Sequence, residues 1–262
     1  MIDINKYNMF LKILEKRISE KEFEEKLLEV QKIDGNHYRK RIMIKELKKD
    51  IEEYRNKEIK ENNFENMQIL LIGNPDIVFK ICLEAIRYNV NIIIGIEDFC
   101  YAQNVFIIEF MKEIYKECKF KNKIEIKNLL KDIEIINNSQ KVDKTICIGN
   151  SNLYHRLDEK INNLYFYPYG IFEIYTDSDE FELLKETILE ISMQNSFELD
   201  FYDELNFDDA VQAINRDGYK FCSLLISKDI NKIQEFKNKI EAKYVMVNEN
   251  PFKQIKFVLE IK

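Results

Sequence analysis

Tryptophan is absent from this chain, and glycine, proline and histidine are scarce: six, three and two residues in 262. The sequence contains no low-complexity tract and no internal repeat of solenoid type. The histidines, His37 and His155, have no cysteine or second histidine at ligand spacing. A zinc or haem site, which needs several such ligands, is therefore not expected.

Long apolar runs are also lacking. No segment approaches the roughly 18 uninterrupted apolar residues of a membrane helix, and the charged start MIDINKYNMFLKILEKRISEK does not fit a secretory signal. The net charge of -7 opposes non-specific binding to nucleic acid. The sequence predicts a cytoplasmic protein with neither a membrane nor a nucleic acid as partner.

The five cysteines are an odd number, lie far apart and stand in apolar patterns, so we expect buried, reduced thiols. The chain is 45% apolar and contains 18 Phe and 14 Tyr. That composition is sufficient for a full hydrophobic core in one or two domains.

Hydrophobic periodicity changes along the chain and predicts three parts. Apolar residues at helical spacing indicate a helical arm over residues 1–66, interrupted at Gly35 and Asn36. From QILLIG onward, short apolar runs alternate with helical patterns, which is typical of a doubly wound parallel sheet of Rossmann-like type. We predict one α/β lobe over residues 67–160 and a second, smaller α/β lobe over residues 161–262.

Three strand-ending turns are the candidate ligand site, because ligands of open parallel sheets bind at the carboxyl ends of the strands. Each turn combines a glycine with short polar side chains that can contact a ligand. Neither G-x-G-x-x-G nor a P-loop sequence occurs. The candidate cofactor-binding residues are Asn74, Pro75, Asp76, Gly95, Glu97, Asp98, Gly149, Asn150 and Ser151.

Two segments carry a family resemblance. The first begins MQILLIGNPDIVFKICLEAIRYNVNIIIGIEDF at Met67, and the second contains DGYKFCSLLISKDINKIQEFKNKIEAKYVMVNENPF. Together they resemble the aldehyde dehydrogenase superfamily, with the glutamyl phosphate reductase-like branch as the best match. The resemblance implies an aldehyde dehydrogenase-like fold, with a nucleotide-binding-like lobe followed by a shortened catalytic-domain-like lobe.

The resemblance also assigns roles to the turn residues. Asn74, Pro75 and Asp76 match an Arg-Pro-Asn turn of the family, whose Asn helps to hold the reacting carbonyl oxygen. The carboxylate of Asp76 would instead repel a developing oxyanion. Gly95 stands where the family usually has Lys or Arg, and Gly149 to Ser151 match a loop under the cofactor. The acids Glu97 and Asp98 favour NAD over NADP as the cofactor, since a carboxylate accepts from ribose hydroxyls and repels a phosphate.

The catalytic residues of the family have no counterpart here. The family's nucleophilic cysteine follows a glutamine within a few residues, but no cysteine follows Gln194. Cys222 lies in the strand-like run FCSLLIS and is expected to be structural. The general-base glutamate would fall near Tyr165–Gly170, where no acid is present, and Glu173 belongs to one face of a strand. By the resemblance, much of the ordinary catalytic domain is also missing.

The sequence therefore predicts a catalytically degenerate aldehyde dehydrogenase-like protein with no catalytic residues, which retains binding of a nucleotide or small ligand. Loss of part of the catalytic domain would expose helices and favour a homo-oligomer or a protein partner. One alternative is an active NAD(P)-dependent oxidoreductase without a covalent cysteine, using Tyr165, Tyr167 or Tyr169 as proton donor beside a lysine. Another is a non-enzymatic interaction or scaffold protein.

Overall fold

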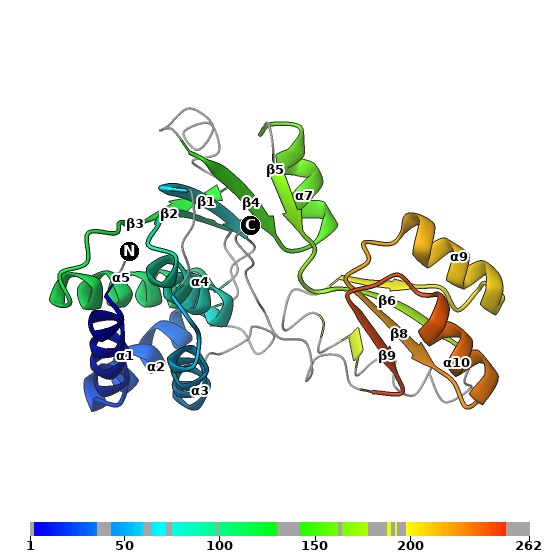
Figure 1. Cartoon of the computed structure of the whole chain (residues 1–262), viewed down its shortest axis with the longest axis horizontal. Coiled ribbons are helices and arrows are strands. Elements are labelled where there is room, and N and C mark those ends of the chain that lie inside the picture. Colours follow the sequence, from blue (N-terminus) through cyan, green and yellow to red (C-terminus); the bar gives the residue numbers. More distant parts are fainter. Residues whose placement is uncertain are drawn as a thin grey trace. The chain divides into compact units, whose positions relative to one another are not determined.

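A computed structural model describes residues 3–35, 43–59, 64–71, 75–97, 100–129, 142–161, 164–177, 188–189, 192 and 198–249. The chain forms two compact units (Figure 1). The first comprises Met1–Ile148, Arg156–Phe166 and Leu259–Lys262, and the second comprises Gly149–His155 and Tyr167–Val258.

The first unit is built on a five-stranded sheet with the order β3-β2-β1-β4-β5. Its strands are β1 (Asn66–Leu71), β2 (Asn91–Ile96), β3 (Ile124–Asn128), β4 (Lys144–Ile148) and β5 (Leu164–Tyr167). Strands β1 to β4 are parallel, and Leu71 at the end of β1 pairs in register with Ile96 and Ile148. The carboxyl ends of β1, β2 and β4 therefore lie level at one edge of the sheet.

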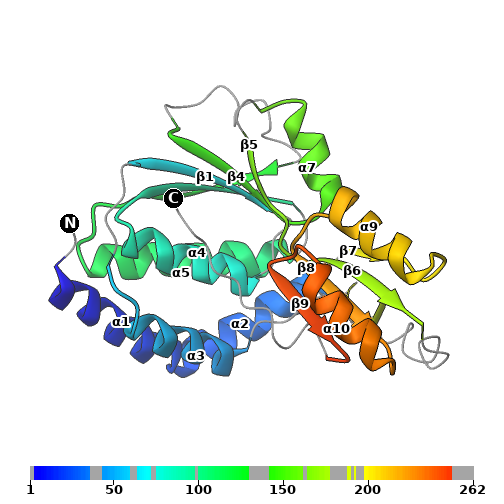
Figure 2. The ribbon, with the colours of Figure 1, turned by 45° about the vertical axis from the view of Figure 1, so that its right-hand side comes forward.

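Two layers of helices cover one face of this sheet (Figure 2). Helices α4 (Pro75–Arg87) and α5 (Tyr101–Glu117) form the inner layer, and α1 (Ile4–Ile18), α2 (Lys21–Asp34) and α3 (Ile44–Arg55) pack on them from outside. The outer helices bury single apolar stripes, as their periodicity predicts. Helix α4 lies between the sheet and the arm, so it is buried on almost every side.

A buried polar network joins the arm to α4. The fully buried carboxylate of Glu84 accepts hydrogen bonds from Tyr54 Oη at 2.7 Å and from Arg87 Nε at 2.6 Å. Tyr54 belongs to α3, and its carbonyl oxygen in turn accepts from Tyr7 Oη of α1 at 3.4 Å. The charge of Glu84 is thus paired with Arg87 and hydrogen-bonded, as a buried charge must be.

The second unit has a four-stranded, fully parallel sheet with the order β7-β6-β8-β9. Its elements are β6 (Ile171–Thr176), β7 (Glu198–Phe201), α9 (Phe207–Asp217), β8 (Cys222–Ile226), α10 (Ile230–Lys239) and β9 (Tyr244–Val247). Helices α9 and α10 pack through a core that includes Phe207, Ile214 and Phe236. A second apolar cluster surrounds Phe172 and Leu224 of β6 and β8.

The α/β class with doubly wound parallel sheets is confirmed. Two elements were not predicted: helix α7 (Ser151–Asp158) and strand β5 lie where the sequence indicated only a turn and a lobe boundary. Helix α7 buries only Leu153 and Leu157, too few positions to reveal a helical period. The helix predicted from Glu180 to Met193 lies mostly outside the described residues. In the described part of the chain, no helix is long and apolar enough to cross a membrane.

Candidate functional site

The sheet order of the first unit locates its ligand crevice. Strands β2 and β3 lie on one side of β1, and β4 and β5 lie on the other, so the winding direction reverses between β1 and β4. In folds of this kind the crevice opens at the carboxyl ends of the two strands that flank the reversal. The three predicted turns follow β1, β2 and β4. Asn74 and Asp98 lie outside the described residues, whereas the other seven candidates are described.

The first turn leads directly into α4. Pro75 is buried as the first residue of the helix, a position that needs no backbone N–H, and Asp76 lies half-buried in its first turn. The charge of Asp76 acts on Asp50 of α3, whose carboxylate lies 3.4 Å from Lys80 Nζ. Burial raises the pKa of Asp50 to about 6; Lys80 opposes this rise and Asp76 adds to it. The electrostatics of Asp76 are therefore coupled to the arm.

The second turn begins later than predicted. Gly95 lies inside β2, which continues to Ile96. A Cβ atom at Gly95 would lie 2.7 Å from Leu70 Cδ2 and 2.8 Å from Leu129 Cδ2, so close packing of apolar side chains accounts for the glycine. Beyond the strand, the Glu97 carboxylate forms an ion pair with Arg156 of α7. Sequence reasoning missed Arg156, because residues 59 positions apart carry no pairing signal.

The third turn, which begins at Gly149, is part of the second unit. The Asn150 side chain caps α7 by accepting from the Leu153 N–H at 2.9 Å. The Ser151 N–H donates to Glu198 Oε2 at 2.7 Å, and Ser151 Oγ donates to Glu198 Oε1 at 2.5 Å. A protein carboxylate thus occupies the N-terminus of α7, where a ligand phosphate would otherwise find free donors.

The helix after the second turn has a similar arrangement. The N–H groups of Ala102 and Gln103, at the start of α5, each donate to the Asp34 carboxylate at 2.9 Å. Asp34 is the last residue of α2, so the arm supplies the cap. Neither Asp34 nor Glu198 was predicted, because each reaches its helix from a distant segment. The first donors of both α5 and α7 are therefore already hydrogen-bonded to carboxylates of the chain itself.

None of the five cysteines lies in the exposed, electropositive environment that activates a nucleophilic thiol. All five cysteines are buried and free of disulfides, which confirms the prediction. Burial raises the pKa of both Cys147 and Cys222 to about 12, and for Cys222 the nearby charge of Glu173 adds to the effect. A thiol becomes nucleophilic as its thiolate, so such thiols are unreactive near neutral pH. In the described ranges, no three His, Cys, Asp or Glu side chains are grouped as metal ligands.

Glu173 belongs to the interior of the second unit. It lies on β6 with no exposed surface, and its carboxylate accepts from Ser223 Oγ at 2.7 Å and from the Lys220 N–H at 3.3 Å. Burial raises its pKa, although these hydrogen bonds work in the opposite direction. A Cβ atom at Gly218 would lie 2.1 Å from Glu173 Oε1. The carboxylate therefore fills a tight internal space and organises the loop before β8.

A tyrosine and lysine pair is present at the edge of the second unit. Lys243 Nζ donates to Tyr167 Oη at 3.3 Å and lies 5.2 Å from the centre of the Tyr167 ring. Lys243 is exposed, whereas Tyr167 is half-buried against Phe221. Tyr165, another predicted proton donor, is 54% exposed and has Lys144 Nζ at 4.9 Å from its ring centre. The lysine that the sequence could not identify for Tyr167 is thus Lys243.

Known structures provide the comparison that sequences do not. No protein-family model and no curated protein matches the chain. Gamma-glutamyl phosphate reductase from Thermotoga maritima is similar in structure, with a TM-score of 0.60, 13% identity and coverage of 94% of this chain and 83% of that chain. Glyceraldehyde-3-phosphate dehydrogenase from Methanocaldococcus jannaschii, solved with NADP, has a TM-score of 0.61 at 13% identity, and the match covers 95% of this chain and 82% of that chain. Betaine aldehyde dehydrogenase from Staphylococcus aureus, solved with NAD+, has a TM-score of 0.59 at 10% identity, and the match covers 95% of this chain and 75% of that chain.

These likenesses extend over nearly the whole chain at identities too low to carry function. They confirm the family resemblance at the level of the fold. The chain has the fold of the aldehyde dehydrogenase superfamily, including the gamma-glutamyl phosphate reductases, in a form shorter than a full aldehyde dehydrogenase.

Proposed function

We propose that this chain is a catalytically degenerate aldehyde dehydrogenase-like protein that acts by binding another molecule and holds no dinucleotide at its strand ends. The observation that carries the proposal is the Glu198 carboxylate, which accepts from both the N–H and the hydroxyl of Ser151. A pyrophosphate at α7 would need those donors and would bring its own negative charge beside this carboxylate. The described residues therefore do not fit a dinucleotide at this helix.

Two further contacts support the proposal. The Asp34 carboxylate accepts hydrogen bonds from the first N–H groups of α5, so the donors of a second helix N-terminus are also bonded within the protein. Glu97, which was predicted to accept from ribose hydroxyls, is paired with Arg156. Displacing these contacts would break charge-assisted hydrogen bonds, which are roughly twice as strong as neutral ones. A dinucleotide would have to compensate for each loss before any net binding.

The chemistry of the thiols also supports a degenerate enzyme. Covalent aldehyde oxidation begins with attack by a thiolate, and the burial of all five cysteines opposes formation of one. Cys222, in the strand expected to be structural, has a pKa raised to about 12. We infer that the protein performs no acyl transfer through cysteine.

One observation favours a second function, that of a proton-transferring oxidoreductase without a covalent intermediate. Tyr167 and Lys243 form the hydrogen-bonded pair that such a mechanism requires, since an adjacent cation stabilises a phenolate. The exposure of Lys243 weakens this candidate, because water screens its charge. An exposed lysine beside a tyrosine is also a common surface contact without a catalytic role. The degenerate, binding function is therefore better supported than the oxidoreductase.

Titration calorimetry of the whole chain with NAD and with NADP tests the proposal. We expect flat titrations for both, while a dinucleotide-binding dehydrogenase run in parallel gives heat. Binding at micromolar strength, about -8 kcal/mol, would overturn the proposal and identify a working crevice. Turnover of aldehydes with NAD(P) that is lost in Tyr167→Phe would establish the oxidoreductase instead.

A further inference from the structure

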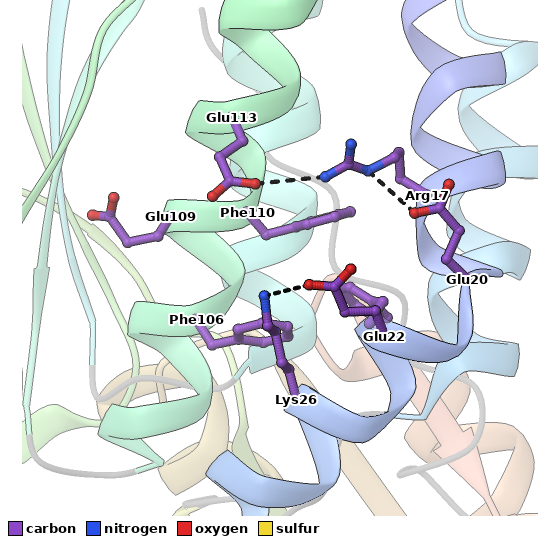
Figure 3. Close-up of a pocket in the computed structure, with 9 residues that line it drawn as sticks. Arg17, Glu20, Glu22, Lys26, Phe106, Glu109, Phe110 and Glu113 are labelled. Carbon is purple, nitrogen blue, oxygen red and sulfur yellow. Dashed lines mark hydrogen bonds and ion pairs between the residues drawn. The ribbon is translucent and has the colours of Figure 1, made fainter.

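A hollow of about 180 Å³ lies on the first unit, away from the strand ends. It is bordered by the end of α1, the start of α2 and the middle of α5 (Figure 3). Its floor is formed by the rings of Phe23, Phe106 and Phe110, whose centroids lie 4.6 Å to 6.4 Å apart. Phe23 and Phe110 are buried, and Phe106 remains half-exposed. Part of an aromatic surface is therefore open to a ligand.

The rim of the hollow is charged. It contains the carboxylates of Glu20, Glu22, Glu109 and Glu113 and the cationic side chains of Arg17 and Lys26. Lys112 also pairs with Glu109 at 2.7 Å, and Arg17 also lies 3.7 Å from Glu117. Five carboxylates against three cationic groups leave an excess of two negative charges, on a chain whose net charge is also negative. The rim thus attracts a cation, and the aromatic floor favours one with a flat or apolar surface.

The present ion pairs across the rim are weak. Arg17 lies 3.5 Å from Glu20 and 3.6 Å from Glu113, longer than hydrogen-bonded contacts, and the Glu113 side chain is 70% exposed. Lys26 pairs with Glu22 at 2.8 Å, but both side chains are more than half exposed. Exposed pairs of this kind contribute about 0–1 kcal/mol each. A competing cation can therefore rearrange them at little cost.

The size of the hollow limits its occupant. A volume of about 180 Å³ is smaller than the roughly 300–1,000 Å³ of pockets that hold drug-sized ligands or cofactors. One long side chain is a better match. Arginine suits the surroundings better than lysine, because its planar guanidinium stacks on aromatic rings while it donates two hydrogen bonds to a carboxylate. Arginine is also enriched among the residues that dominate protein interfaces.

We propose that this hollow is the docking point for an arginine side chain of a basic partner protein, with the guanidinium against the half-exposed ring of Phe106 and paired with Glu113. The proposal is independent of whether a dinucleotide binds at the strand ends. Helices α2 and α5, which are long and well packed, give the site a rigid frame.

The test uses Nα-acetyl-arginine amide as a probe, titrated into the isotope-labelled whole chain and followed by amide chemical shifts. We expect saturable shifts at Phe23, Phe106 and Phe110 with millimolar affinity. Nα-acetyl-citrulline amide has the same shape without the charge, and Nα-acetyl-lysine amide has the charge without the plane. Both should bind more weakly. Equal binding of either analogue, or no saturable shift with the arginine probe, would overturn the proposal.

Variants locate the site. Glu113→Gln removes one rim charge at a surface position and should weaken binding of the arginine probe by about two- to fivefold. Phe106→Leu retains apolar volume but removes the aromatic ring, and it should weaken binding of the arginine probe more than binding of the lysine probe. Glu29→Gln is the matched control, since Glu29 is exposed on α2 outside the hollow. If Glu113→Gln binds the probe as the wild type does, the site lies elsewhere and the assignment is wrong.

Discussion

At the scale of single residues, several half-buried carboxylates of this protein bond groups on distant segments of the chain. Asp34, Glu97 and Glu198 each bond a group that is far away in the sequence. Periodicity identifies which positions are polar, but it cannot indicate what a polar side chain meets after folding. For this reason the sequence identifies Ser151 as a candidate in the turn, but not Glu198, which accepts both of its hydrogen bonds.

Asp50 provides a residue-scale prediction. Its pKa is raised to about 6, so the folded state holds this proton more tightly than the unfolded state does. The wild type should therefore lose stability relative to Asp50→Asn as the pH rises from about 4 to 6, by up to about 3 kcal/mol. Well below pH 3.8, the ordinary pKa of an aspartate, both side chains are neutral in the folded and unfolded states, and this pH-dependent difference should vanish. Urea unfolding of both proteins across this pH range measures it, and a difference that grows at low pH would contradict the assignment.

At the scale of elements, the arm is attached to the first lobe by specific polar contacts as well as by apolar packing. Helices α1 and α3 meet α4 through Tyr7, Tyr54 and Glu84, and α2 caps α5 through Asp34. The helices of the arm were predicted because their apolar stripes are regular. Helix α7 was not predicted, since most of its surface is polar and the residue that caps its first N–H, Glu198, lies 47 positions away in the sequence.

The contact between α3 and α4 yields an element-scale prediction. Glu84→Gln removes the negative charge that faces Arg87, which is only 4% exposed, and leaves a buried guanidinium without a counter-charge. We expect a loss of about 3 kcal/mol in the free energy of unfolding. Glu52→Gln, also on α3 but exposed and paired with Arg55, should change it by less than about 0.5 kcal/mol. Equal effects of the two variants in urea unfolding would show that the network contributes little.

At the scale of the whole molecule, the chain has the fold of the aldehyde dehydrogenase superfamily, and its own carboxylates accept from the first N–H groups of α5 and α7. The first unit retains the strand order that creates a crevice, and the chain's own carboxylates take the helix donors on which a phosphate would depend. The predicted division at residues 67 and 161, the NAD preference and self-association remain predictions. The shared fold is compatible with the proposed loss of activity, because function resides in particular side chains.

The burial of the thiols yields a prediction for the whole molecule. Because all five cysteines are inaccessible in the folded state, a thiol reagent such as Ellman's reagent should modify close to none of them in the native protein at neutral pH. All five should react at once after unfolding in guanidinium. Stoichiometric modification of one thiol in the native protein would reveal an activated cysteine and would undermine the proposed loss of catalysis.

The sequence by itself determined the α/β class, the order of most strands and helices, the resemblance to the superfamily and the lack of a cysteine after Gln194. These features follow from the local spacing of apolar residues and from residue identity, both of which can be read directly from the sequence. Only the tertiary structure decided that Gly95 serves packing, that Arg156 neutralises Glu97 and that Glu198 occupies α7. Such contacts depend on which distant segments the folded chain brings within about 3 Å, the range of a hydrogen bond, and no local pattern encodes that.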